Sequence, residues 1–144
     1  KSTDSTNNGE NIDGSKITSN TYTIGNKYIT NVPPKTTISV FKNNVSYEGY
    51  EISFLGNGSL KTSGYISTNM DVVFSNNATI ISRKIIVTGD ITCDGNVNSK
   101  DTNLMMKYLL GTSTLNNVCR KAGDLTGNGK LSNADLVAMA QMRE

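Results

Sequence analysis

The sequence predicts an α+β protein in which a small β-rich module of the β-grasp type precedes an α-helical module. Three observations support this class. Residues 16–88 contain short segments with strand-like alternation and one segment with helical spacing. Two Asp/Asn/Gly-rich loops follow, and each is succeeded by a helical pattern. Composition divides the chain into a linker over residues 1–15, an accessory module over 16–88 and a second module over 89–144.

The first module is predicted to be mostly strand, with a single helix. The predicted strands cover residues 21–24, 28–32, 50–55, 65–67, 70–74 and 79–87. Thr36 and Thr37 can cap a helix on which Ile38, Phe41 and Val45 share one face. Two strands, a helix and then further strands favour a β-grasp arrangement over an immunoglobulin-like sandwich, because the sandwich has no place for that helix.

Two twelve-residue stretches, 90–101 and 124–135, have the pattern of calcium-binding loops. Each has oxygen-bearing side chains at loop positions 1, 3, 5, 9 and 12 and glycine at position 6, where the chain must turn sharply. Position 7 contributes its backbone carbonyl. The predicted ligands are Asp90, Thr92, Asp94, Asn96, Asn98 and Asp101 in loop 1, and Asp124, Thr126, Asn128, Lys130, Ser132 and Asp135 in loop 2. We therefore expect two Ca²⁺ sites.

A single loop of this kind has an alternative interpretation as a polar turn without a metal. The duplication favours the calcium sites, because both loops follow a glycine and both have an apolar residue at position 8. Loop 1 offers three carboxylates and loop 2 offers two, so site 2 is expected to bind calcium more weakly. Loop 1 ends in Asp101 and loop 2 in Asp135, whereas EF-hand loops usually have glutamate at position 12. A full helix-loop-helix EF-hand is therefore less favoured.

Helices are predicted after both loops. Apolar residues at helical spacing follow loop 1 up to Gly111 and follow loop 2 from Leu136 to Met142. A short helix over residues 115–121 is expected in the connector between the two units. These apolar side chains are interpreted as core, except Met106, which falls on another face. The core of this module is small, so metal binding is expected to be needed for its folding.

Residues 89–144 resemble a type I dockerin in the two loops with Asp at position 12 and in the sequence Lys-Tyr-Leu-Leu-Gly at 107–111. The resemblance implies a calcium-dependent module that binds a cohesin and anchors a larger secreted protein to a scaffold or cell surface. It also implies a bacterial, extracellular, cellulosome-type assembly for polysaccharide degradation. Thr92 and Thr126 depart from the family, which usually has Asn or Asp at loop position 3. The first module resembles the small accessory domains, called X modules, that precede dockerins.

The resemblance also implies which residues contact the partner. They are Ser99, Lys100, Met106 and Lys107 in the first unit, and Asn133, Ala134, Ala140 and Gln141 in the second. The two sets differ in chemistry, so only one face is expected to suit a given partner, and we expect the first unit to carry more of the recognition. The last strand of the first module meets Gly89 without a linker, so the two modules are expected to pack together.

Cys93 and Cys119 form the only possible cysteine pair. A disulfide would clip the connector to loop 1, and an extracellular setting favours it. Two free thiols remain an alternative. A zinc site is disfavoured because the chain has no histidine.

Composition argues against several other functions. The absence of histidine removes the usual general base, and the carboxylates that cluster do so in the calcium loops, so we expect no enzymatic activity. The net charge of +2, without a basic run, gives no support for binding to nucleic acid or to membranes, and no apolar stretch is long enough for a bilayer span. The chain begins with Lys1 and shows no signal peptide, so we expect a fragment of a larger secreted protein. The alternative function is a calcium-stabilised structural terminus of a bacterial surface protein without a cohesin partner.

Overall fold

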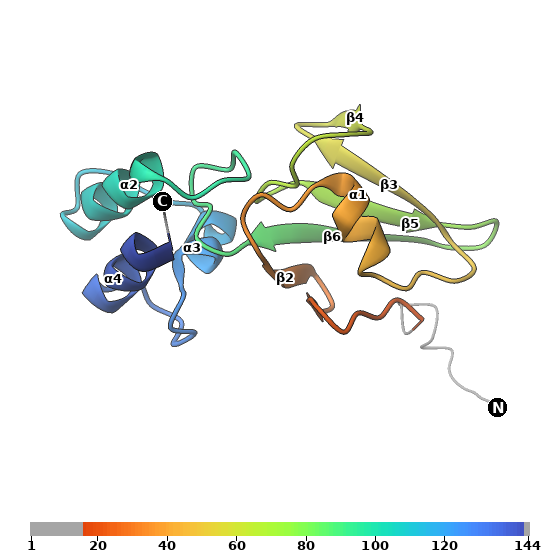
Figure 1. Cartoon of the computed structure of the whole chain (residues 1–144), viewed down its shortest axis with the longest axis horizontal. Helices are drawn as coiled ribbons and strands as arrows, with labels where there is room; N and C mark the ends of the chain where they lie inside the picture. Colours follow the sequence, from red (N-terminus) through yellow and green to blue (C-terminus); the bar gives the residue numbers. More distant parts are fainter. Residues whose placement is uncertain (1–15, 143–144) are drawn as a thin grey trace.

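The structure, a computed structural model, describes residues 16–142. It consists of a six-stranded sheet with one helix packed on it, followed along the long axis of the molecule by three further helices (Figure 1). The predicted linker over residues 1–15 lies outside the described residues.

The sheet has the strand order β1-β2-β6-β5-β3-β4. The strands are β1 (Thr23–Ile24), β2 (Tyr28–Val32), β3 (Glu51–Gly56), β4 (Ser59–Lys61), β5 (Asp71–Ser75) and β6 (Ile80–Val87). All neighbouring strands are antiparallel except β2 and β6, which are parallel. The helix α1 (Ile38–Asn43) lies in the long connection that a parallel pair requires.

The helix α1 forms where the sequence predicted a helix, and it packs against the sheet. Its first turn is capped by Thr37, whose side-chain oxygen accepts a hydrogen bond from the Val40 N–H at 3.2 Å. Phe41 is fully buried, stacks on Tyr22 with 5.0 Å between ring centroids, and meets Phe54 edge-on. The core of the first module therefore lies between α1 and the sheet.

Two details of the predicted strands are wrong. Residues 65–67 do not form a strand, because the Ile66 N–H donates to the carbonyl of Thr36 and only one isolated bridge joins Tyr65 to Thr37. The short strand β4 was not predicted, because all three of its residues are exposed and give no alternation of burial. The assignment of the module to the β-grasp type stays a prediction.

The predicted helices of the second module are confirmed as α2 (Ser99–Leu109), α3 (Asn117–Gly123) and α4 (Asn133–Met142). The helix α2 ends as expected before Gly111, which has φ +81°. The N–H groups of Gly111 and Thr112 donate to the carbonyls of Tyr108 and Lys107, so the last turn is closed by backbone bonds. Met105 and Met139 are fully buried, which confirms their interpretation as core.

The two modules are in contact at the end of β6, which leads directly into the helices (Figure 1). Ile86 on this strand belongs to the helical core, whereas its neighbours Ile85 and Val87 belong to the sheet core. The Gly89 N–H donates to the carbonyl of Ala122 at 2.7 Å. Lys121 lies over the ring of Tyr28 at 4.9 Å. The expected packing of the modules is therefore present at the junction.

Candidate metal centre

Loop 1 brings three carboxylates together. One oxygen from each of Asp90, Asp94 and Asp101 lies within 4.8 Å of the others. Negative charges at this separation repel one another unless a cation lies between them. Their oxygen ligands suit a hard divalent cation such as Ca²⁺.

Asp101, at loop position 12, both closes loop 1 and starts α2. Its buried carboxylate accepts hydrogen bonds from the backbone N–H of Thr92 at 3.0 Å, the Thr92 hydroxyl at 2.8 Å and the Asn98 N–H at 3.0 Å. The Asn98 side chain in turn caps α2. This capping box explains why a calcium-type loop passes directly into a helix.

Asp90, at loop position 1, is fully buried. Its carboxylate accepts hydrogen bonds from the N–H groups of Asp94 at 3.0 Å and Gly95 at 2.8 Å, and from Thr68 in the first module at 3.0 Å. Burial raises the pKa of Asp90 to about 6, although these backbone donors act in the opposite direction. A cation in the loop would favour the charged form.

Loop 2 repeats the hydrogen bonds of loop 1. Asp135 accepts from the backbone N–H of Thr126 at 3.0 Å, from the Thr126 hydroxyl at 3.0 Å and from the Ser132 N–H at 2.9 Å. Asp124 accepts from the Gly129 N–H at 2.8 Å, which equals the distance from Gly95 to Asp90. The same positions thus perform the same roles in both loops, and the two units are structural duplicates.

The other predicted ligands lie in the loops with different degrees of exposure. Asp94 and Asn128 at position 5 are exposed, and each accepts the N–H of the residue two positions later. Asn98 and Ser132 at position 9 accept N–H groups of the first turns of α2 and α4. The oxygen-rich residues present fit calcium, and loop 1 has the larger negative charge. The individual coordination of each residue stays a prediction.

Cys93 and Cys119 lie side by side in the helical module. Their Sγ atoms are 3.7 Å apart and are not bonded to each other in this structure. The hydrogen bond between the thiols and burial raise the pKa of Cys93, whereas the same hydrogen bond lowers the pKa of Cys119 to about 7. The structure thus brings the predicted pair into proximity, and the disulfide itself stays a prediction.

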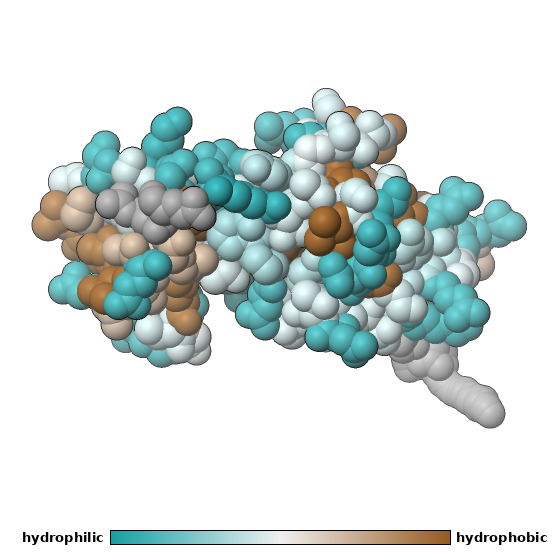
Figure 2. Space-filling view, in the orientation of Figure 1, coloured by the Kyte–Doolittle hydropathy of each residue, from teal (hydrophilic) through white to brown (hydrophobic). Residues whose placement is uncertain are grey.

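All eight residues predicted to contact a partner are exposed: Ser99, Lys100, Met106, Lys107, Asn133, Ala134, Ala140 and Gln141. Figure 2 shows apolar surface over the part of the molecule where α2 and α4 lie in Figure 1. Two exposed apolar residues there, Leu110 and Val137, were not predicted as contact residues. The exposure of Val137 could have been predicted from the sequence. Residues two positions apart on a helix point to nearly opposite sides, and Met139 is buried.

The comparison with protein families gives one match: residues 88–142 match the family described as dockerin type I domain. No curated protein and no solved structure matches the chain. Dockerin domains in general bind calcium and cohesins, and proteins that carry them are typically extracellular or associated with the cell surface. Within residues 16–142, no helix is long and apolar enough to cross a membrane.

Proposed function

We propose, on the premise that residues 88–142 form a type I dockerin domain, that this chain anchors a larger secreted protein by calcium-dependent binding to a cohesin. Loops 1 and 2 each hold one Ca²⁺, and the helices that follow them provide the contact surface. The partner is a cohesin on a scaffold or on the cell surface, in a cellulosome-type assembly for polysaccharide degradation. The proposal assigns no catalytic role to residues 16–142.

The observation that carries this proposal is the duplication of loop and helix. In both units, the carboxylate at loop position 12 is buried and binds the N–H groups of positions 3 and 9. Filling each loop with an ion would therefore fix the start of the next helix. The exposed residues of that helix are then held in a defined arrangement, which lowers the entropic cost of docking.

The two contact surfaces differ in their chemistry. The first unit exposes Met106 and two lysines, Lys100 and Lys107, which suits a partner with an apolar centre and an acidic rim. The second unit presents small and uncharged residues, including Ala134 and Ala140. We infer that the first unit carries more of the recognition for a given cohesin. The sheet module is proposed as an accessory domain of the X-module kind.

Binding of the full chain to a panel of cohesins, in millimolar calcium and in chelator, tests the proposal. Biolayer interferometry should show a tight complex with at least one cohesin in calcium and loss of that complex in chelator. The variant Asp101→Asn with Asp135→Asn should bind at least about tenfold more weakly, because each loop loses a charged ligand. Glu51→Gln is the matched control, because it changes an exposed carboxylate in the sheet module.

The alternative function, a structural terminus stabilised by calcium, predicts a different result. Calcium would still raise the melting temperature of the helical module, but no cohesin of the panel would bind. An equal loss of binding in the Glu51→Gln control would show that the loops have no special role in docking.

A further inference from the structure

The two calcium loops are duplicates in themselves but differ in their surroundings. Asp90 in loop 1 accepts a hydrogen bond from Thr68, which belongs to the sheet module, at 3.0 Å. Its counterpart Asp124 accepts hydrogen bonds only from its own loop among the described residues. Asp90 is fully buried, whereas Asp124 is partly exposed. Among residues 16–142, the sheet module therefore donates a hydrogen bond to the first carboxylate of loop 1 and none to that of loop 2.

The glycines at loop position 6 show the same difference. Gly95 and Gly129 have nearly equal backbone conformations, with φ +86° and +87°. A Cβ atom on Gly95 would lie 2.8 Å from the carbonyl oxygen of Ile66 and 2.9 Å from the Cβ of Tyr65, whereas a Cβ on Gly129 would meet nothing within 4 Å. The Gly95 carbonyl also accepts the Lys35 N–H at 2.8 Å. The turn of loop 1 is thus packed against the sheet module on two sides.

The segment that contacts loop 1, residues 65–68, is itself held by the sheet. The Thr68 hydroxyl donates to the carbonyl of Val87 at 3.2 Å and accepts the Val87 N–H at 3.0 Å. The Ile66 N–H donates to the carbonyl of Thr36 at 2.7 Å. Ile66 and Thr68 are both buried. The segment is therefore held by hydrogen bonds within the sheet module in addition to its contacts with loop 1.

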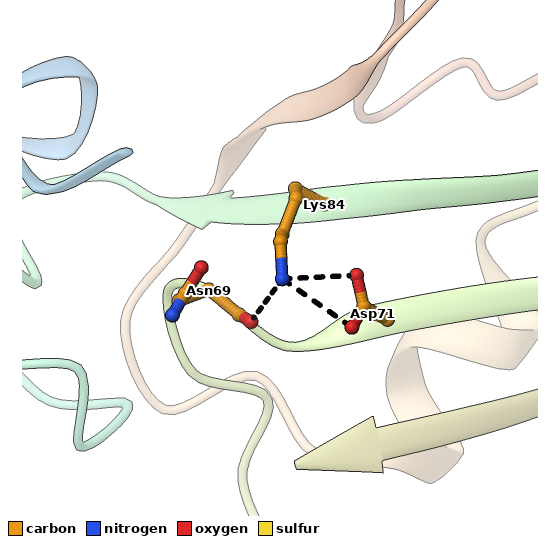
Figure 3. A network of polar contacts seen from close by, with 3 residues as sticks. All are labelled: Asn69, Asp71 and Lys84. Carbon is orange, nitrogen blue, oxygen red and sulfur yellow. Dashed lines mark hydrogen bonds and ion pairs between the residues drawn. The ribbon is translucent and has the colours of Figure 1, made fainter. Parts of the chain in front are cut away.

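A polar network holds the chain immediately after this segment (Figure 3). Lys84 on β6 contacts Asp71 on β5 at 3.1 Å and the carbonyl of Asn69 at 3.4 Å. The Asn69 N–H donates to the carbonyl of Ile85 at 2.9 Å. The segment 65–68 therefore has fixed supports on both sides, at Thr36 and at β6.

We propose that the sheet module is a structural part of calcium site 1, with Thr68 as a positioning residue for Asp90. The module holds the first ligand and the glycine turn in place before the ion arrives, so less conformational freedom is lost on binding. By linkage, calcium in site 1 strengthens the contact between the modules by the same factor. Site 2 lacks this support. The inference rests on the proposed calcium binding and is independent of any cohesin.

The two glycines provide a matched test in the full chain. Gly95→Ala and Gly129→Ala share the strain of a side chain at positive φ, but only Gly95→Ala collides with Ile66. Calcium titrations followed by calorimetry and by the NMR amide signals of residues 95 and 129 give the affinity of each site. Gly95→Ala should lose at least about tenfold more affinity at site 1 than Gly129→Ala loses at site 2, a factor within the usual range of coupling.

Hydrogen exchange of the wild-type chain gives a second test, which remains valid if Gly95→Ala does not fold. The amides of Thr68 and Lys35 both donate to loop 1 and should exchange at least about tenfold more slowly in calcium than in chelator. The Ser46 amide, which donates to Thr18 within the sheet module, is the control and should change much less.

The outcomes separate this inference from the proposed function. If the loop amides of residues 95 and 129 respond to calcium but those of Thr68 and Lys35 do not, the coupling is wrong and calcium binding stands. Equal losses of affinity in the two glycine variants would also overturn the coupling. If neither loop responds to calcium, the proposed function fails and the inference fails with it.

Discussion

Cys93 has a left-handed backbone conformation, and the residue at the same position of the second loop is a glycine. Cys93 lies at loop position 4 with φ +66°, and Gly127 lies at the same position of loop 2 with φ +73°. A side chain in this left-handed region costs roughly 1 kcal/mol or more relative to glycine. The thiol of Cys119, at 3.7 Å from the Cys93 thiol, is a contact that offsets part of this cost.

The variant Cys93→Gly therefore has opposite effects under the two redox conditions. With reductant, the variant should be as stable as the wild type or more stable, because the strain is removed. Without reductant, it should be less stable, because a disulfide closing this segment contributes about 3 kcal/mol. Thermal unfolding with and without reductant measures both effects, and the intact mass of the wild type should be two hydrogens lower without reductant.

Cys119→Ala is the control for that experiment, because it removes the bridge and leaves the strain at Cys93. It should be less stable than Cys93→Gly under both conditions. Two titratable thiols per chain in the unreduced wild type, with equal melting temperatures in both conditions, would show that the disulfide does not form.

The charge at loop position 5 offers a test of the predicted difference between the two sites. Asp94 is exposed and accepts one hydrogen bond, from the Asn96 N–H, whereas buried Asp101 also supports the loop backbone. Asp94→Asn therefore changes the ion site with little effect on the fold. It should weaken site 1 by about tenfold or more, because one carboxylate near a divalent ion is lost.

The reverse change, Asn128→Asp, should strengthen site 2 by a similar factor, since it gives loop 2 the residue found in loop 1. Isothermal calorimetry on the full chain measures both sites. If neither substitution changes the calcium affinity of its site, the charge of the loops does not determine which site binds calcium more tightly.

At the scale of the elements, the helices of the second module were predictable because their start signals are local. Asn98 and Asn116 cap α2 and α3 with their own side chains, and Gly111 ends α2 by its positive φ. The loops were predictable for the same reason, since their ligands and turn glycines lie within twelve residues of one another.

The segment 65–67 was wrongly predicted as a strand because its partners are distant in the sequence. Its alternating residues resemble a strand, but the Ile66 N–H pairs with Thr36 and its other side faces Gly95. No local pattern shows that this segment faces loop 1 instead of a neighbouring strand. The support of Asp90 by Thr68 was unpredictable from sequence for the same reason, because it joins residues 22 positions apart in two different modules.

The proposed contact surface on α2 and α4 can be tested with two double variants. Met106→Ala with Lys107→Ala should weaken cohesin binding by about tenfold or more, because it removes an exposed apolar anchor and a charge. Ala140→Glu with Gln141→Ala should have the smaller effect if the first unit carries the recognition. Affinity is measured after circular dichroism shows that both variants are folded.

All four residues are exposed, so the fold should tolerate the substitutions. A larger loss from the pair on α4 would assign the recognition to the second unit. No loss from either pair would show that these helix positions do not contact the cohesin.

At the scale of the whole molecule, β6 belongs to both modules. Its central position in the sheet places β2 on one side and β5 on the other, and its final residues enter the helical module. Because successive side chains of a strand point to opposite faces, Ile85 and Ile86 lie in different cores. The strand β6 thus connects the sheet rigidly to the first residue of loop 1.

Ile85→Val and Ile86→Val form a matched pair for this arrangement. Each removes one methylene from a buried isoleucine, which costs about 0.5–1.5 kcal/mol. In calcium, Ile86→Val should destabilise mainly the helical module, and Ile85→Val mainly the sheet module. Urea unfolding followed by NMR signals of Met105 and Phe74, one buried reporter for each core, separates the two effects. A larger loss at Phe74 than at Met105 in Ile86→Val would show that this side chain does not support the helices, and the shared strand would then join the modules by its backbone alone.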